Sequence, residues 1–117
     1  MLGVRLEKGT SLTKITVLKC FDTEEVFKKP PIKAKYSGPC PMFKEGQTFC
    51  VDDVMPDGFC PYAWVSIFPL IMTLRFGGNC FEWYEEPGAG VGCCPDGLRP
   101  VIFKLERKAP ETESSSH

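Results

Sequence analysis

The sequence lacks the histidines that cysteine chemistry usually needs, because its only histidine is His117. A nucleophilic cysteine commonly works with a histidine base, so a Cys-His catalytic pair is not expected. No two cysteines have the C-x-x-C spacing that is frequent in structural zinc sites. A glycine-rich phosphate loop is absent as well. These absences disfavour the common enzyme motifs and direct attention to the cysteines themselves.

Long apolar runs are also lacking. The longest stretch without a charged residue is 58–74, which is barely of membrane-spanning length and contains Pro61 and Pro69. A buried core helix is the better interpretation, and we expect no membrane. Residues 1–8 contain no apolar run long enough for a signal peptide. We therefore expect a cytoplasmic location, where thiols stay reduced.

The formal net charge is only −1, and the basic residues lie mainly in the first part of the chain. Four lysines there are interrupted by two prolines: Lys28, Lys29, Lys33 and Lys35. They lack the arginine forks and stacking aromatics of a nucleic-acid-binding surface. A solvated loop explains the segment, and nucleic acid is not expected as a partner.

The pattern of the chain predicts alternating short elements. Residues 13–21 are rich in β-branched side chains and predict a strand, and residues 47–52 predict a second. Between them, Asp22 is a suitable N-cap for a short helix that ends before the prolines. The apolar run 62–76 predicts one helix kinked at Pro69, or two helices.

The last part of the chain predicts a β-hairpin, since residues 89–94 and 99–106 flank a Pro-Asp-Gly turn. The whole order indicates a single α+β domain with a mainly antiparallel sheet, a C-terminal hairpin and one main helix. We expect an N-terminal extension over 1–12, the domain over 13–108, and a disordered polar tail over 109–117.

Three of the seven cysteines are followed directly by proline: Cys40, Cys60 and Cys94. Proline fixes its own φ and holds the preceding residue extended, so each thiol sits at a rigid corner. Cys93 adjoins Cys94 where Pro95 turns the backbone. We predict that Cys40, Cys60, Cys93 and Cys94 bind a metal, either zinc or an iron–sulfur cluster, in a structural or redox role.

Other readings of the cysteines stay open. Cys20, Cys50 and Cys80 lie in or beside apolar stretches and are interpreted as buried, inert thiols. The protein could equally be an interaction or oligomerisation module with structural thiols, which predicts a protein partner or a homo-oligomer. A thiol oxidoreductase that uses Cys93 and Cys94 is a further alternative, because thiol redox chemistry needs no histidine.

Several short motifs together resemble a family of short prokaryotic proteins of unknown function, found notably in anaerobes. The resemblance covers roughly residues 13–107, and its motifs are Gly38-Pro39-Cys40, Gly58-Phe59-Cys60-Pro61-Tyr62-Ala63-Trp64, Phe76-Gly77-Gly78-Asn79 and Cys93-Cys94-Pro95-Asp96-Gly97-Leu98-Arg99-Pro100-Val101. It implies no particular activity, cofactor or substrate. An anaerobic setting would suit oxygen-sensitive thiolates or an iron–sulfur cluster.

Overall fold

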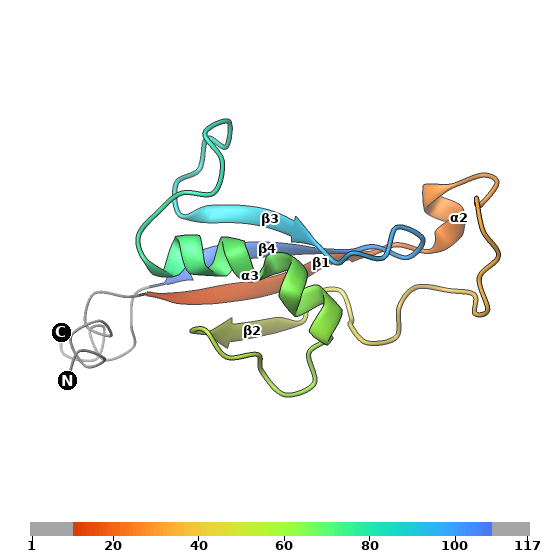
Figure 1. Cartoon of the computed structure of the whole chain (residues 1–117), viewed down its shortest axis with the longest axis horizontal. Coiled ribbons are helices and arrows are strands. Elements are labelled where there is room, and N and C mark those ends of the chain that lie inside the picture. Colours follow the sequence, from red (N-terminus) through yellow and green to blue (C-terminus); the bar gives the residue numbers. More distant parts are fainter. Residues whose placement is uncertain (1–10, 109–117) are drawn as a thin grey trace.

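A computed structural model of the chain describes residues 11–108, which form one antiparallel sheet with a helix across it (Figure 1). The four strands have the order β2-β1-β4-β3. The elements are β1 (Leu12–Cys20), α2 (Thr23–Val26), β2 (Thr48–Val51), α3 (Pro61–Arg75), β3 (Ala89–Cys93) and β4 (Val101–Lys108).

The predicted α+β class is confirmed, with its antiparallel sheet, its C-terminal hairpin β3–β4 and one main helix. Residues 1–10 of the predicted extension and the predicted tail 109–117 lie outside the described residues. None of the helices in the described part of the chain is both long enough and apolar enough to cross a membrane.

The central strands β1 and β4 supply one side of the core. Ile15 pairs with Leu105 and Val17 pairs with Phe103. Because alternate residues of a strand point to opposite faces, these four side chains share one face of the sheet. All four are almost completely buried, so this face of the sheet is covered by other parts of the chain.

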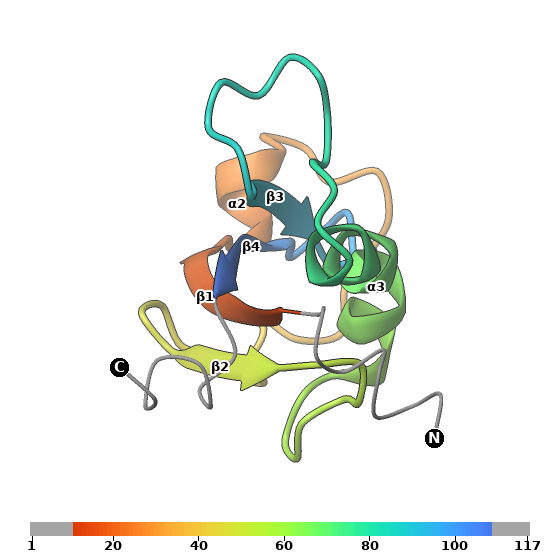
Figure 2. The same ribbon diagram turned by 90° about the vertical axis from the view of Figure 1, so that its left-hand side faces the viewer.

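Helix α3 covers that face (Figure 2). Ala63, Ile67, Ile71 and Leu74 recur every three or four residues, form one stripe along the helix, and are fully buried. Pro61 begins the helix, where its missing N–H costs nothing. A single helix continues through Pro69, which settles the choice between one helix and two.

Strand β3 lies close to α3 because the residues of β3 that face the helix, Gly90 and Gly92, are both glycines. A Cβ on Gly92 would lie 2.9 Å from Cγ2 of Ile67, and a Cβ on Gly90 would lie 2.7 Å from Sγ of Cys80. Neither position leaves room for a side chain. The neighbouring Val91 and Cys93 therefore face the opposite side of the sheet.

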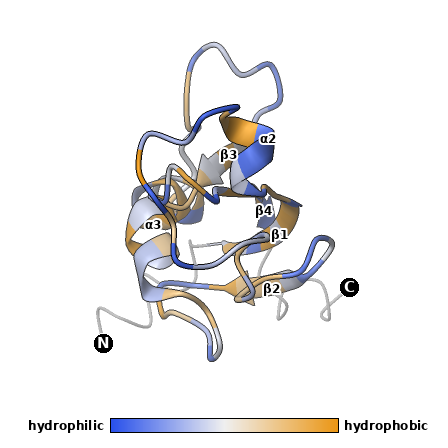
Figure 3. Cartoon of the chain, turned by 90° about the vertical axis from the view of Figure 1, so that its right-hand side faces the viewer, coloured by the Kyte–Doolittle hydropathy of each residue, from blue (hydrophilic) through white to orange (hydrophobic). Residues whose placement is uncertain are grey.

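The long connection between α2 and β2 is fastened to the sheet at its end. Gly46 donates its N–H to the carbonyl of Val17 at 2.8 Å, and Val17 donates to the carbonyl of Gln47 at 2.8 Å. These bonds bring Phe43 into the core, where only 5% of its surface is exposed. The rest of this connection is largely hydrophilic, whereas α3 and the strands carry the hydrophobic segments (Figure 3).

Candidate functional site: a thiol-lined pocket

The three Cys-Pro corners meet at one pocket. It has a volume of about 240 Å³, and Cys40, Cys60 and Cys94 all line it. The other lining residues are Phe43, Tyr62, Pro95, Asp96, Arg99 and Val101. Three thiols that are far apart in the chain are thus gathered at the N-terminal end of α3.

Cys40 is held between a buried aromatic and an arginine. Phe43, three residues later, packs edge-on against Phe103 with ring centroids 5.2 Å apart. On the other side, Nη1 of Arg99 donates to the carbonyl oxygens of Gly38 and Pro39 at 3.4 and 3.5 Å. Arg99 therefore links the Cys40 corner to the hairpin that carries Cys94.

Cys60 is the N-cap residue of α3 and is placed by the turn before it. Phe59 donates its N–H to the carbonyl of Pro56 at 3.3 Å. Phe59 is only 3% exposed, and its ring contacts the ring of Phe43, with centroids 4.9 Å apart. The Cys60 side chain makes no capping hydrogen bond, so its sulfur is left to face the pocket at the positive end of the helix dipole.

Cys94 is fixed by two hydrogen bonds to the first residue of β4. Its N–H donates to the carbonyl of Val101 at 3.0 Å, and the N–H of Val101 donates to Sγ of Cys94 at 3.3 Å. Oδ1 of Asp96 accepts the N–H groups of Leu98 and Arg99 at 2.9 and 3.4 Å, which closes the turn between them. An N–H that points at sulfur stabilises a negative charge there.

Cys20 lies beside the same pocket, although no sequence motif assigns it a functional role. Its thiol contacts the carbonyl of Phe43, with Sγ and O 3.7 Å apart. Its N–H donates to Oε2 of Glu45 at 2.9 Å. Burial raises the pKa of the Cys20 thiol, and the negative charges of Glu45, Cys40 and Cys94 raise it further. Cys20 is therefore in contact with Phe43, a residue of the pocket wall.

Cys93, the fourth predicted ligand, does not line the pocket. It pairs with Ile102, whereas Val101 and Phe103 on either side of Ile102 point toward α3. Burial raises the pKa of the Cys93 thiol, and the neighbouring Cys94 raises it further. The structure thus brings Cys40, Cys60 and Cys94 together at the pocket, whereas Cys93 lies outside its wall.

The two remaining cysteines lie away from the pocket. Cys80 packs beside Gly90 on the core, and burial raises its pKa. The expectation that Cys50 is buried was wrong, since it is exposed on the edge strand β2, opposite Lys14 of β1. All seven cysteines lie within the described residues, and all are free thiols.

Within residues 11–108, no group of three or more His, Cys, Asp or Glu side chains is arranged so that it could hold a metal ion. The predicted ligand set of Cys40, Cys60, Cys93 and Cys94 stays a prediction. What the arrangement does provide is a pocket with three thiols in its wall and an apolar floor formed by Phe43 and Val101.

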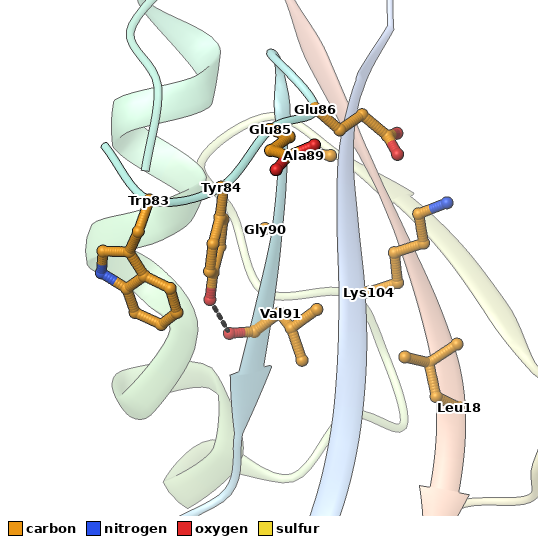
Figure 4. A pocket seen from close by; sticks show the side chains of 9 residues that line it. All are labelled: Leu18, Trp83, Tyr84, Glu85, Glu86, Ala89, Gly90, Val91 and Lys104. Atoms are coloured by element: carbon orange, nitrogen blue, oxygen red, sulfur yellow. Dashed lines mark hydrogen bonds between the residues drawn. The ribbon is translucent and has the colours of Figure 1, made fainter. Parts of the chain in front are cut away.

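A second pocket, of about 350 Å³, lies at the opposite side of β3 (Figure 4). Trp83 lines it, is 71% exposed, and stacks on Phe81 with ring centroids 5.5 Å apart. The hydroxyl of Tyr84 donates to the carbonyl of Val91 at 3.5 Å. No thiol is among its lining residues, so this surface is separate from the cysteine site.

Comparison with protein-family models, with curated proteins and with solved structures finds no match to the chain. Its class therefore follows from the fold and the site alone. It is an α+β protein with a thiol-lined pocket at the N-terminal end of its main helix.

Proposed function

We propose that this protein binds a metal centre through the thiolates of Cys40, Cys60 and Cys94, and that the centre is an iron–sulfur cluster. The observation that carries the proposal is the meeting of all three Cys-Pro corners at one pocket. Proline after each cysteine restricts the backbone and lowers the entropy lost when the sulfur is fixed. A zinc ion is the alternative occupant.

The size of the pocket favours a cluster over a single ion. Its volume of about 240 Å³ equals that of roughly eight water molecules in the liquid, at about 30 Å³ each. A structural zinc ion sits within about 2.3 Å of each sulfur and needs far less room. Iron–sulfur clusters are larger and are held by cysteine thiolates from the surrounding chain.

The surroundings of the pocket suit negatively charged sulfur. The N-terminus of α3 carries a partial positive charge next to Cys60. The Val101 N–H points at Sγ of Cys94, and the Arg99 guanidinium lies in the pocket wall. Hydrogen bonds to sulfur and exclusion of solvent set the reduction potential of a bound cluster. The chain therefore supplies the thiolate ligands and also the groups that would set the reduction potential of the cluster.

Reduced thiols are a condition of this proposal, and a cytoplasmic location would keep them reduced. The experiment is anaerobic reconstitution of the protein with Fe²⁺ and sulfide, with a parallel loading by Zn²⁺. The wild type should give the broad visible absorption of an iron–sulfur cluster. Cys40→Ser, Cys60→Ser and Cys94→Ser should each reduce it, while Cys50→Ser, the exposed control, should retain it.

Less than about 0.1 iron per chain in the wild type would refute the cluster proposal. Stoichiometric zinc that depends on Cys40, Cys60 and Cys94 would replace the cluster with zinc. Equal iron in the Cys40→Ser and Cys50→Ser variants would show that the pocket is not the site.

The thiol-oxidoreductase alternative is less well supported. Cys93 and Cys94 are adjacent in the chain, but burial raises the pKa of Cys93 and so reduces the thiolate fraction that would attack a disulfide or peroxide. An interaction module with structural thiols would use a surface such as that around Trp83. It predicts that Cys40→Ser lowers stability and that the wild type binds no metal.

A further inference from the structure

Cys20, at the end of β1, lies beside the pocket and contacts its wall without being one of the lining residues. Cys20 pairs with Val101, which is buried and lines the pocket. Paired residues of adjacent antiparallel strands point to the same face, so Cys20 shares the face of Val101, toward α3. The 3.7 Å contact between Sγ of Cys20 and the carbonyl of Phe43 places the thiol against another lining residue.

Cys20 and Cys93 differ in their relation to the core. Cys20, Cys40, Cys60 and Cys94 all pack against the hydrophobic core, whereas Cys93 is not among the side chains packed there. Cys93 pairs with Ile102 instead of with a residue of the pocket wall. Cys20, by contrast, adjoins two residues of the pocket wall, Phe43 and Val101.

We propose that Cys20, and not Cys93, is the fourth ligand of the thiolate site, completing a set with Cys40, Cys60 and Cys94. The inference rests on the proposed function and specifies it, because a [4Fe–4S] cluster is commonly held by four cysteine thiolates. Each thiol loses its proton when it binds iron. The hydrogen bond from the Cys20 N–H to Glu45 holds the end of β1 against the segment that carries Phe43.

The test compares two matched variants of the whole chain, Cys20→Ser and Cys93→Ser, after reconstitution with Fe²⁺ and sulfide without oxygen. The wild type and Cys93→Ser should each hold about four iron atoms per chain. Cys20→Ser should lose one iron or more and show the electron paramagnetic resonance signal of a three-iron cluster. Circular dichroism of both apo variants confirms that they are folded.

A second measurement uses the wild-type protein without metal, so it needs neither iron loading nor a folded variant. Dibromobimane, which joins two nearby thiols, should link Cys20 to Cys40 or Cys94 in the reduced apo protein, as read by peptide mass spectrometry. Links from Cys93 to Cys40 or Cys60, with none from Cys20, would overturn the inference.

The iron contents separate the two possible failures. A wild type that takes up no iron refutes both the cluster and its fourth ligand. Full iron in Cys20→Ser together with lost iron in Cys93→Ser refutes only the assignment of Cys20 and leaves the thiolate site in place.

Discussion

The packing of α3 on β3 can be tested by adding one methyl group, in Gly92→Ala. The new Cβ would lie 2.9 Å from Cγ2 of Ile67 and 3.4 Å from Cδ1 of Leu70. Ile67 is fully buried, and its β-branched side chain has one strongly preferred rotamer in a helix, so the methyl cannot swing aside. The helix or the strand must therefore shift by a few tenths of an ångström.

Overpacking of this kind costs about 1–3 kcal/mol. Alanine also restricts the unfolded chain, which returns about 0.4–1 kcal/mol. The middle of the two ranges gives a fall of about 1.3 kcal/mol in the free energy of unfolding, which lowers the midpoint of thermal unfolding by about 5–10 °C for a domain of this size. Urea and thermal unfolding followed by circular dichroism measure both quantities.

Gly97→Ala is the matched control, because a Cβ there meets nothing within 4 Å and Gly97 has no positive φ. Its stability should stay within about 0.5 kcal/mol of the wild type. A Gly92→Ala protein as stable as Gly97→Ala would refute the close contact between α3 and β3. The position of Cys60 at the pocket depends on the same contact, since Cys60 precedes the first residue of α3.

Two further predictions concern the thiols and their support. Arg99→Gln removes the guanidinium that links the Cys40 corner to the Cys94 hairpin. In competition with a chelator, the variant should retain iron about tenfold more weakly than the wild type. Unchanged retention would contradict a positioning role for Arg99. Burial raises the pKa of the Cys80 and Cys93 thiols in the folded protein. The stability that these thiols contribute is therefore complete below their pKa in the unfolded chain, about 8.5, and is lost as the pH rises through their higher pKa in the folded protein. Between about pH 7.5 and about pH 10 the urea midpoint of the apo protein should therefore fall more in the wild type than in the Cys80→Ser, Cys93→Ser double variant, and equal falls would refute that effect of burial.

Much of the fold could be predicted from local patterns. The β-branched run before Cys20, the Pro61 start of α3 and the turn between β3 and β4 each carry their own signal, and each element lies within a few residues of its expected place. The strand order could not be predicted, because it depends on pairings between residues far apart. Nothing in the local sequence shows that β1 lies between β2 and β4.

The site could be predicted only in part for the same reason, because local sequence does not show which distant residues meet. Proline marks Cys40, Cys60 and Cys94 as rigid corners in the sequence itself, and these three line one pocket. Cys20 carries no such mark, since its relation to the pocket arises from pairing with Val101 across the sheet. Cys93 was predicted from its adjacency to Cys94 at the Pro95 turn; whether it lines the pocket depends on its pairing with Ile102, which adjacency does not reveal. The role of Arg99 could not be predicted either, because its contacts with Gly38 and Pro39 are equally remote in sequence.

Cysteine footprinting tests the central claim most directly. The chain is alkylated with and without prior loading by Fe²⁺ and sulfide, and each of the seven cysteines is then quantified by peptide mass spectrometry. Loading should protect the thiolate site, which consists of Cys20, Cys40, Cys60 and Cys94. The other three, Cys50, Cys80 and Cys93, should react at the same rate with and without loading. Unchanged reactivity at Cys40, Cys60 and Cys94 would contradict the account.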